Sequence, residues 1–254
     1  MSIGQGRTIF ESHTEAGCLS VVDALDVRYL YLDTKVVQSA MDLSRPTRLV
    51  LEYTKSMMAF LIFQPAPQRI LLLGLGGGSV AKFIMTHFPQ AELTIVEQRQ
   101  DVIDVARQYF YLSEHPRLSI INDDALFYLR RLEVDKKSLF DVVLVDIFDG
   151  HGMSHPMHDY EIYKYIRSAM SANGIAVFNL WSQNPSAFDA VFECMSVSYA
   201  NNLLNLTVPD KGNIIVFATH KEWKKKEIMR QKERAHCLEN QCDLPFIRYL
   251  RGFK

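Results

Sequence analysis

Residues 70–79 read ILLLGLGGGS, a short aliphatic run followed at once by a glycine-rich segment. The run predicts a strand that is buried on both faces, and the glycines predict a tight turn into a helix that begins at Ser79. Backbone N–H groups at such a helix start favour an anionic or polar ligand. Glycines serve any tight strand-to-helix turn, however, so this segment alone does not identify the ligand.

The alternation of apolar runs and amphipathic segments continues as far as residue 219. Further strands are expected at 93–97, 118–122, 140–148, 174–180, 202–208 and 213–219, and helices at 79–88, 100–110, 125–132, 159–170 and 185–199. Buried strands separated by helices predict a doubly wound, mostly parallel α/β sheet. The last two strands are joined only by residues 209–212, which is too short for a helical crossover, so they are expected to pair antiparallel.

The two ends of the chain follow other patterns. Short strands at 8–11, 18–22, 27–32 and 35–38 predict a small antiparallel β unit, followed by a helix over Pro46–Phe63. Residues 221–254 carry a net charge of +5 against −6 for residues 1–220. Because both signs are interleaved, a solvated helix anchored by LPFIRYL (244–250) is favoured over a nucleic-acid arm.

Three regions are therefore expected. Residues 1–65 would form the small N-terminal β unit with its connecting helix, residues 66–220 a Rossmann-like nucleoside-binding catalytic domain, and residues 221–254 a basic C-terminal helical tail.

Composition limits the classes of partner. The chain has 254 residues, 48% of them hydrophobic, and a net charge of −1, so no overall field attracts nucleic acid or an anionic membrane. Its longest apolar run, residues 57–63, is far shorter than the roughly 20 residues that span a bilayer. The four cysteines include no C-x-x-C pair and are expected to be reduced, and the N-terminus lacks a secretory pattern. A soluble, cytoplasmic protein is expected.

Acidic residues end the strands that follow the glycine turn. Glu97 lies 23 residues beyond Gly74, where an acidic side chain binds the hydroxyls of a ribose. Asp123 and Asp124 end the next strand, where a carboxylate can accept a hydrogen bond from an adenine amino group or cap the helix that begins at Ala125. Both roles can hold together, since there are two aspartates and one cap. Together, the antiparallel last strand and the acidic residue after the third strand resemble the fold of S-adenosylmethionine-dependent transferases more than that of nicotinamide-binding proteins.

A carboxylate pair, Asp146 and Asp149, follows the fourth strand in VDIFDG (145–150). Such a pair at the carboxyl edge of a parallel sheet can hold a cationic amine and take its proton as the amine becomes a nucleophile. Asp149-Gly150 is also a strong turn dipeptide, so a turn role for Asp149 stays open.

The ordered set of motifs resembles the spermidine synthase (polyamine aminopropyltransferase) family, in a divergent spermidine synthase-like branch. The motifs are ILLLGLGGGSVAKF (70–83), TIVEQRQDVIDVARQYF (94–110), NDDAL (122–126) and FDVVLVDIFDG (140–150), with LDTKVVQS (32–39) similar to part of the family's N-terminal β-domain. The resemblance implies transfer of the aminopropyl group of decarboxylated S-adenosylmethionine to a diamine such as putrescine, in polyamine biosynthesis and without a metal. It also implies a homodimer formed through the N-terminal strands.

The resemblance assigns roles by position. Gly74 and Gly76 would line the nucleoside, Glu97 would bind ribose, Asp124 with Asp123 beside it would bind adenine, Asp146 would be the base, Asp149 would hold the diamine, Tyr53 would line the amine site, and Gln38 would lie near the donor sulfur.

Several positions depart from the family pattern. Gly77 stands where the family has an aspartate that holds the donor amine, Tyr53-Thr54-Lys55 replaces Tyr-His-Glu, and residues 208–212 replace Tyr-Pro-Ser-Gly. Each change removes a group that would face a polycation. The motifs that would bind the nucleoside are retained, whereas several positions that would face the diamine differ from the family pattern.

The loop after Asp149 carries His151, His155 and His158, which could bind zinc. Because the resemblance needs no metal, a gating loop over the crevice is favoured.

Two alternatives to aminopropyl transfer stay open. Loss of the acid at Gly77 removes what would repel a donor carboxylate, so a methyltransferase that uses S-adenosylmethionine itself is plausible. A nucleoside-binding protein without turnover would keep Glu97 and Asp124 but would not need Asp146.

Overall fold

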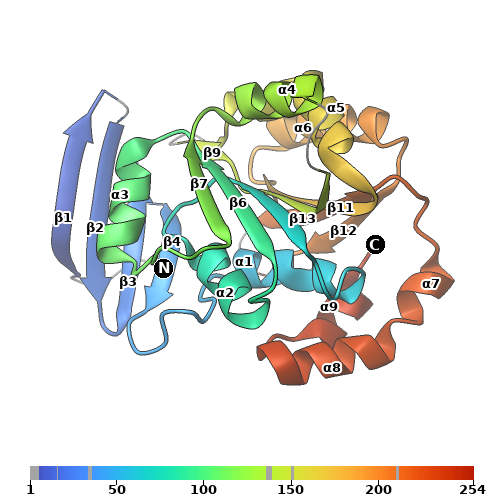
Figure 1. Cartoon of the computed structure of the whole chain (residues 1–254), viewed down its shortest axis with the longest axis horizontal. Coiled ribbons are helices and arrows are strands. Elements are labelled where there is room, and N and C mark those ends of the chain that lie inside the picture. The colour runs from blue at the N-terminus through green and yellow to red at the C-terminus, as the bar shows by residue number, and fades with distance from the viewer. Residues whose placement is uncertain (1–5, 16, 34–35, 136–138, 150–151, 210–211) are drawn as a thin grey trace.

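The computed structural model describes residues 6–15, 17–33, 36–135, 139–149, 152–209 and 212–254. The chain forms a four-stranded sheet near its N-terminus, a seven-stranded sheet and a short two-stranded ribbon (Figure 1).

The N-terminal sheet is antiparallel throughout, with its strands in chain order. These strands are β1 (Arg7–Thr14), β2 (Gly17–Ala24), β3 (Val27–Leu32) and β4 (Val37–Asp42). Leu19, Val21 and Leu30 form one buried cluster with Val102 and Val105 of helix α3 (Gln100–Tyr109). The predicted antiparallel unit is confirmed, and it packs on the larger unit through α3 (Figure 1).

The connection between the two sheets differs from the prediction of one helix over Pro46–Phe63, which is wrong at its start. The backbone N–H groups of Ser44 and Arg45 donate to the Asp42 carboxylate over 2.9 and 3.1 Å, which forms a turn, and Leu49 bridges back to Met41 of β4. This segment is therefore held to the sheet. The helical part comprises α1 (Glu52–Met57) and the 3-10 helix η1 (Met58–Ile62).

The seven-stranded sheet has the order β12-β13-β11-β8-β5-β6-β7. Its strands are β5 (Arg69–Leu73), β6 (Glu92–Glu97), β7 (Leu118–Asn122), β8 (Phe140–Val145), β11 (Met170–Trp181), β12 (Leu203–Thr207) and β13 (Asn213–Thr219). The five strands from β11 to β7 are parallel, and β13 runs antiparallel to both of its neighbours. The doubly wound sheet with an antiparallel last strand is confirmed.

The run predicted as one strand over 140–148 divides in two. After β8 the chain forms the ribbon β9 (Phe148–Asp149) and β10 (Gly152–Met153), and then the 3-10 helix η2 (His155–His158).

Helices cover both faces of the large sheet. Along β5, Ile70 and Leu72 join one buried cluster, whereas Leu71 and Leu73 join the other, as the two-residue period of a strand requires. The first cluster includes residues of η1, α2 (Ser79–His87), α8 (Lys232–Cys242) and α9 (Phe246–Gly252). The second includes residues of α4 (Ala125–Asp135), α5 (Tyr160–Ala169) and α6 (Pro185–Ser198).

The C-terminal segment forms α7 (Lys225–Met229), α8 (Lys232–Cys242) and α9 (Phe246–Gly252). Leu238, Phe246 and Leu250 are buried in the cluster that contains η1, and the Arg234 guanidinium donates to the carbonyl of Ile62 over 3.0 Å. All four cysteines of the chain are free thiols. Within the described ranges, the helices are all too short or too polar to cross a membrane.

Candidate functional site

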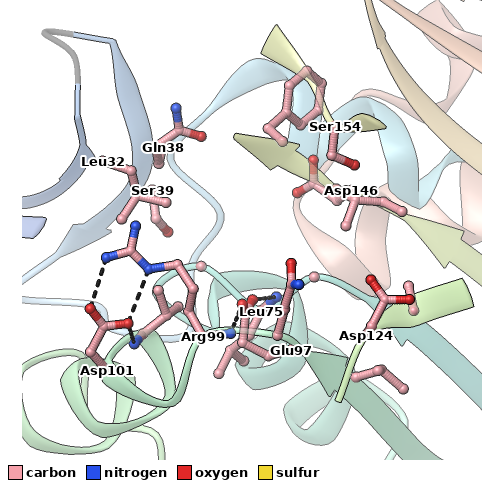
Figure 2. Close-up of a pocket in the computed structure, with 18 of the residues that line it drawn as sticks. Leu32, Gln38, Ser39, Leu75, Glu97, Arg99, Asp101, Asp124, Asp146 and Ser154 are labelled. Carbon is pink, nitrogen blue, oxygen red and sulfur yellow. Dashed lines mark hydrogen bonds and ion pairs between the residues drawn. The ribbon is translucent and has the colours of Figure 1, made fainter. Parts of the chain in front are cut away.

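A cavity of about 840 Å³ lies at the carboxyl ends of β5, β6, β7 and β8, where α/β sheets of this kind bind ligands. Side chains from the N-terminal sheet and from α1 close its other side (Figure 2). The predicted residues that line it are Gln38, Tyr53, Gly74, Gly76, Glu97, Asp123, Asp124 and Asp146. The structure therefore brings together every predicted site residue whose side chain it describes.

The glycine turn is shaped by its neighbours. Gly74 has a φ of +91°, and a Cβ built there would lie 2.2 Å from the carbonyl oxygen of Asp146. Only glycine fits this position, because strand β8 ends directly against the turn. The backbone of Asp146, the expected base, thus contacts the glycine turn at Gly74 directly.

Gly77, where the family has an aspartate, has no space for a side chain. A Cβ at this position would lie 2.8 Å both from Cδ1 of Phe110 and from Oγ of Ser39. The Ser39 hydroxyl in turn lies 3.2 Å from that of Ser79, at the start of α2. Ser39 of β4 and Phe110, which follows α3, therefore leave little room for a side chain where the family resemblance expects an acid.

Glu97 is held by the backbone. One carboxylate oxygen accepts the N–H of Leu75 over 3.0 Å, and the other accepts the N–H of Arg99 over 2.9 Å. Burial raises the pKa of Glu97, and the two N–H groups oppose that rise by stabilising the ionised form. Because each oxygen has a second lone pair, the carboxylate can still accept hydrogen bonds from two hydroxyls of a ligand.

The two aspartates after β7 have different partners. Oδ1 of Asp124 accepts the N–H groups of Leu126 and Phe127 over 2.8 and 3.0 Å, so Asp124 supplies the cap of α4. Within the described ranges, its other oxygen accepts no hydrogen bond. Asp123 forms an ion pair with Arg131. Asp124 can therefore cap the helix through one oxygen and bind a ligand through the other.

Asp146 lies at the end of β8, and its carboxylate points into the cavity (Figure 2). Burial raises the pKa of Asp146 to about 6, even though the Nδ2 of Asn179 donates to its Oδ1 over 2.9 Å and favours the charged form. The negative charge of Glu97 adds to the rise. A carboxylate with such a pKa is half protonated near pH 6 and can exchange a proton under physiological conditions.

Tyr53 approaches the same carboxylate from α1. Its hydroxyl donates to the backbone carbonyl of Gln38 over 3.1 Å, which ties α1 to β4 beside the cavity. Burial, and then the negative charge of Asp146, raise the pKa of Tyr53 well above its ordinary value, so the phenol stays neutral. The amide side chain of Gln38 lies on the cavity wall across from Asp146 (Figure 2).

The loop after β8 is described in part. Asp149 belongs to β9 by its backbone, but its side chain and all of His151 lie outside the described residues. His155 lines the cavity, as does Ser154, whose hydroxyl oxygen is buried without a hydrogen-bond partner among the described residues. A buried hydroxyl of this kind is expected to bind a ligand group or a water molecule.

Acidic groups dominate the lining. The described acidic residues of the cavity are Asp33, Glu97, Asp101, Asp123, Asp124 and Asp146, whereas Arg99 is the one Lys or Arg among the described lining residues. The Arg99 guanidinium donates twice to Asp101, over 2.8 and 3.0 Å (Figure 2). It also lies 3.8 Å from the Asp33 carboxylate. Its charge is therefore neutralised within the protein, and the cavity favours a cationic ligand.

Potential metal ligands gather elsewhere. Among the described residues, Glu11, His13 and Cys18 on the β1–β2 hairpin place their potential ligand atoms within 4.8 Å of one another. This group lies outside the cavity. In the part of the loop that is described, His155 and His158 belong to no such set.

Sequence reasoning missed several residues of the site. Asn179, which contacts Asp146, interrupts the apolar run of β11, and a polar residue within a buried run is a signal that could have identified it. Arg99 and Ser39 gave no comparable signal, because they contact Asp33 and Ser79, which are distant in the sequence. Ser154 also went unnoticed, since a serine in a loop is common.

Comparison with known proteins was made by family and by individual chain. The family model for the spermine/spermidine synthase domain matches residues 51–232. A polyamine aminopropyltransferase of Neisseria meningitidis is 36% identical over 231 residues, which cover 90% of this chain and 86% of that protein. An eEF1A lysine and N-terminal methyltransferase of Xenopus laevis is 25% identical over 232 residues, which cover 82% of this chain but 33% of that protein.

Among solved structures, a spermidine synthase in complex with the transition state analogue AdoDATO superposes with a TM-score of 0.71 at 18% identity. The match covers 96% of this chain and 88% of that one. This likeness shows that the two chains share a fold.

Proposed function

Because the chain belongs to the spermine/spermidine synthase family, as its motifs predict, we propose that it transfers the aminopropyl group of decarboxylated S-adenosylmethionine to an amine. The observation that carries the proposal is the convergence of Glu97, Asp124 and Asp146 on one acidic cavity beside the glycine turn.

The donor would lie along the ends of β5, β6 and β7. Glu97 would accept hydrogen bonds from the ribose hydroxyls, and the second oxygen of Asp124 would accept one from the adenine amino group. Gly74 and Gly76 let the chain approach the nucleoside closely. Asp123 would support this side through its ion pair with Arg131, and Gln38 would lie near the sulfur.

The charge of the lining supports the decarboxylated donor. A sulfonium and an ammonium group both suit a cavity in which Glu97, Asp124 and Asp146 have no Lys or Arg ion-pair partner among the described residues. Arg99, the one Lys or Arg among the described lining residues, is already engaged by Asp101, so it is a poor partner for the carboxylate of S-adenosylmethionine. Desolvating that carboxylate without a cationic partner is costly.

The reaction would proceed by substitution at the carbon beside the sulfonium. The nitrogen of a neutral amine forms the new C–N bond while the C–S bond breaks and its electron pair leaves with sulfur, which gives methylthioadenosine. Asp146 takes the proton that the amine nitrogen loses, and neutral Tyr53 lines the amine site. Asp149 would hold the far end of a diamine. Activity should fall as the pH drops through about 6, because protonation of Asp146 removes the base.

Methyl transfer from S-adenosylmethionine is the second candidate. It is supported by the eEF1A methyltransferase relative and by the absence of an acid at Gly77, which would otherwise repel the donor carboxylate. A protein that only binds a nucleoside, without turnover, would not need the carboxylate of Asp146.

Finer features of the proposal follow the family resemblance. We propose a reaction that needs no metal, a homodimer formed through the N-terminal sheet, a cytoplasmic location and a small-molecule amine, not nucleic acid or membrane, as the partner.

Thermal-shift measurements with three ligands test the donor. Decarboxylated S-adenosylmethionine should stabilise the protein more than S-adenosylmethionine at equal concentration, with methylthioadenosine as the control for the shared nucleoside. A larger shift with S-adenosylmethionine would favour methyl transfer, and no shift with any of the three would contradict both candidates.

A further inference from the structure

Two asparagines lie in the interior of the sheet next to Asp146. Asn179, near the end of β11, is 3% exposed, and Asn213, the first residue of β13, is 6% exposed; the residues next to each of them in its strand are apolar. A buried amide is costly unless its donors and acceptor are satisfied, so the two residues call for a physical reason.

The sheet register brings Asn179 beside Asp146 and places Asn213 diagonally from Asn179. Val145 pairs with Phe178 across β8 and β11, so the following residues, Asp146 and Asn179, lie side by side. Asn179 pairs with Ile215 of β13, and Asn213 is the diagonal neighbour two positions earlier on the same face. One polar side chain therefore comes from β13, one from β11 and one from the residue that follows β8, and the three are neighbours across the sheet.

The side chains form a directed chain of hydrogen bonds. Nδ2 of Asn213 donates to Oδ1 of Asn179 over 2.9 Å, and Nδ2 of Asn179 donates to Oδ1 of Asp146 over 2.9 Å. Because Asn213 occupies the carbonyl oxygen of Asn179, it determines which end of that amide faces the carboxylate. If the Asn179 amide were reversed, its Oδ1 would face Oδ1 of Asp146, and the two oxygens would repel each other.

Neither asparagine lines the cavity, whereas Asp146 does. They therefore reach a ligand only through Asp146. We propose that Asn179 and Asn213 are positioning residues, which hold one oxygen of the Asp146 carboxylate inside the sheet and leave the other to face the amine in the cavity. This inference rests on the proposed function for its catalytic consequence, but the hydrogen-bond chain can be tested without turnover.

The other titratable groups that act on Asp146 are Tyr53 from α1 and Glu97 from the end of β6. Neither contacts Asn179 or Asn213 through a hydrogen bond among the described residues. Substitution of either asparagine should therefore change the hydrogen bonding of Asp146 without changing that of Tyr53 or Glu97.

The decisive variant is Asn179→Leu, which keeps the side-chain size and removes the donor to Asp146. We expect kcat for aminopropyl transfer at pH 7 to fall about tenfold and the acid limb of the kcat–pH profile to move up by about one pH unit, because the ionised carboxylate loses a hydrogen bond. Affinity for methylthioadenosine should stay within about twofold, since the asparagines do not line the cavity. Asn213→Ala should shift the profile in the same direction by less, and should add nothing in the Asn179→Leu background.

Asn205→Leu is the matched control. Asn205 lies on β12 of the same sheet, where it pairs with Val216 of β13. Its side-chain oxygen is buried without a hydrogen-bond partner among the described residues. The same substitution there should leave the pH profile unchanged.

Infrared titration of the Asp146 carboxyl band, assigned by its loss in Asp146→Asn, gives a readout that needs no activity. If aminopropyl transfer itself fails in the wild type, the band should still titrate at higher pH in Asn179→Leu than in the wild type. Asn213→Ala supplies the same test should Asn179→Leu not fold. Equal titration midpoints and equal pH profiles in the wild type and both variants would overturn the proposal.

Discussion

The two sides of the cavity, which we propose bind the donor and the acceptor, hold their carboxylates in different ways. Glu97 and Asp124 are held by backbone N–H groups within a few residues of a strand end, whereas Asp146 is held by the side chain of Asn179 and lies beside Tyr53 from another unit. Backbone N–H groups at strand ends are fixed by the sheet and depend little on the identity of side chains elsewhere in the chain. Groups held by distant side chains can be tuned or lost by single substitutions, which agrees with the erosion of the family pattern on the acceptor side.

The largest expected effect separates the two sides. Asp146→Asn should lower the rate of aminopropyl transfer by about 10²–10⁴-fold, because it removes the base. Methylthioadenosine affinity, measured by calorimetry, should stay nearly unchanged, because Asn keeps the size of the side chain. Full activity in this variant would remove Asp146 as the base, and a parallel loss of nucleoside affinity would mean that the two sides are not separable.

The converse change lies on the donor side. Glu97→Gln should weaken methylthioadenosine binding by roughly 10–100-fold, as expected for hydrogen bonds to a charged group. Turnover at saturating donor should change much less, because the substitution leaves Asp146 and Asn179 in place. Calorimetry and saturation kinetics measure the two quantities, and an unchanged dissociation constant would exclude Glu97 from ribose binding.

The boundary between the sides lies at Gly77. Restoring the family acid with Gly77→Asp should destabilise the fold by about 1–3 kcal/mol, because the new Cβ meets Phe110 and Ser39 at 2.8 Å. Gly77→Ala is the control for the clash without the charge and should have a similar cost in thermal unfolding. Wild-type stability together with tighter binding of the decarboxylated donor in Gly77→Asp would show that the position is open after all.

The smallest effect is on stability against pH. The folded-state pKa of Asp146, about 6, lies above the ordinary value of 3.8, so the folded chain binds the proton more tightly than the unfolded chain. Protonation thus stabilises the fold as the pH falls from 7 towards 4, and the ionised group is a cost above pH 6. Asp146→Asn should remove that cost and raise stability at pH 8 by about 1–2 kcal/mol, allowing for partial exposure to the cavity. The gain should vanish near pH 4, and a gain independent of pH would contradict the assigned pKa.

Local signals predicted the donor side. A strand, its glycine turn and the acidic residue at the next strand end are consecutive features, so Gly74, Glu97 and Asp124 could be recognised from spacing alone. The sequence predicted a cap from Asp123 or Asp124, since an aspartate before a helix is a common cap, but it divided the cap and the ligand between two aspartates. The structure puts the cap on one oxygen of Asp124, the residue also expected to bind adenine.

Long-range contacts account for what the sequence did not predict. The closing of Gly77 depends on Ser39 and Phe110, which come from opposite directions along the chain. The late start of α1 depends on the bridge between Leu49 and Met41, which no local propensity encodes. The hydrogen bond from Asn213 to Asn179 requires the register of β11 and β13.

Product analysis tests the central claim most directly. Purified protein is incubated with putrescine and either decarboxylated S-adenosylmethionine or S-adenosylmethionine, and the nucleoside and amine products are quantified by mass spectrometry. We expect methylthioadenosine and aminopropylated amine in equal amounts from the decarboxylated donor, and no S-adenosylhomocysteine from the other. S-adenosylhomocysteine with a methylated acceptor, and no methylthioadenosine, would contradict the assignment.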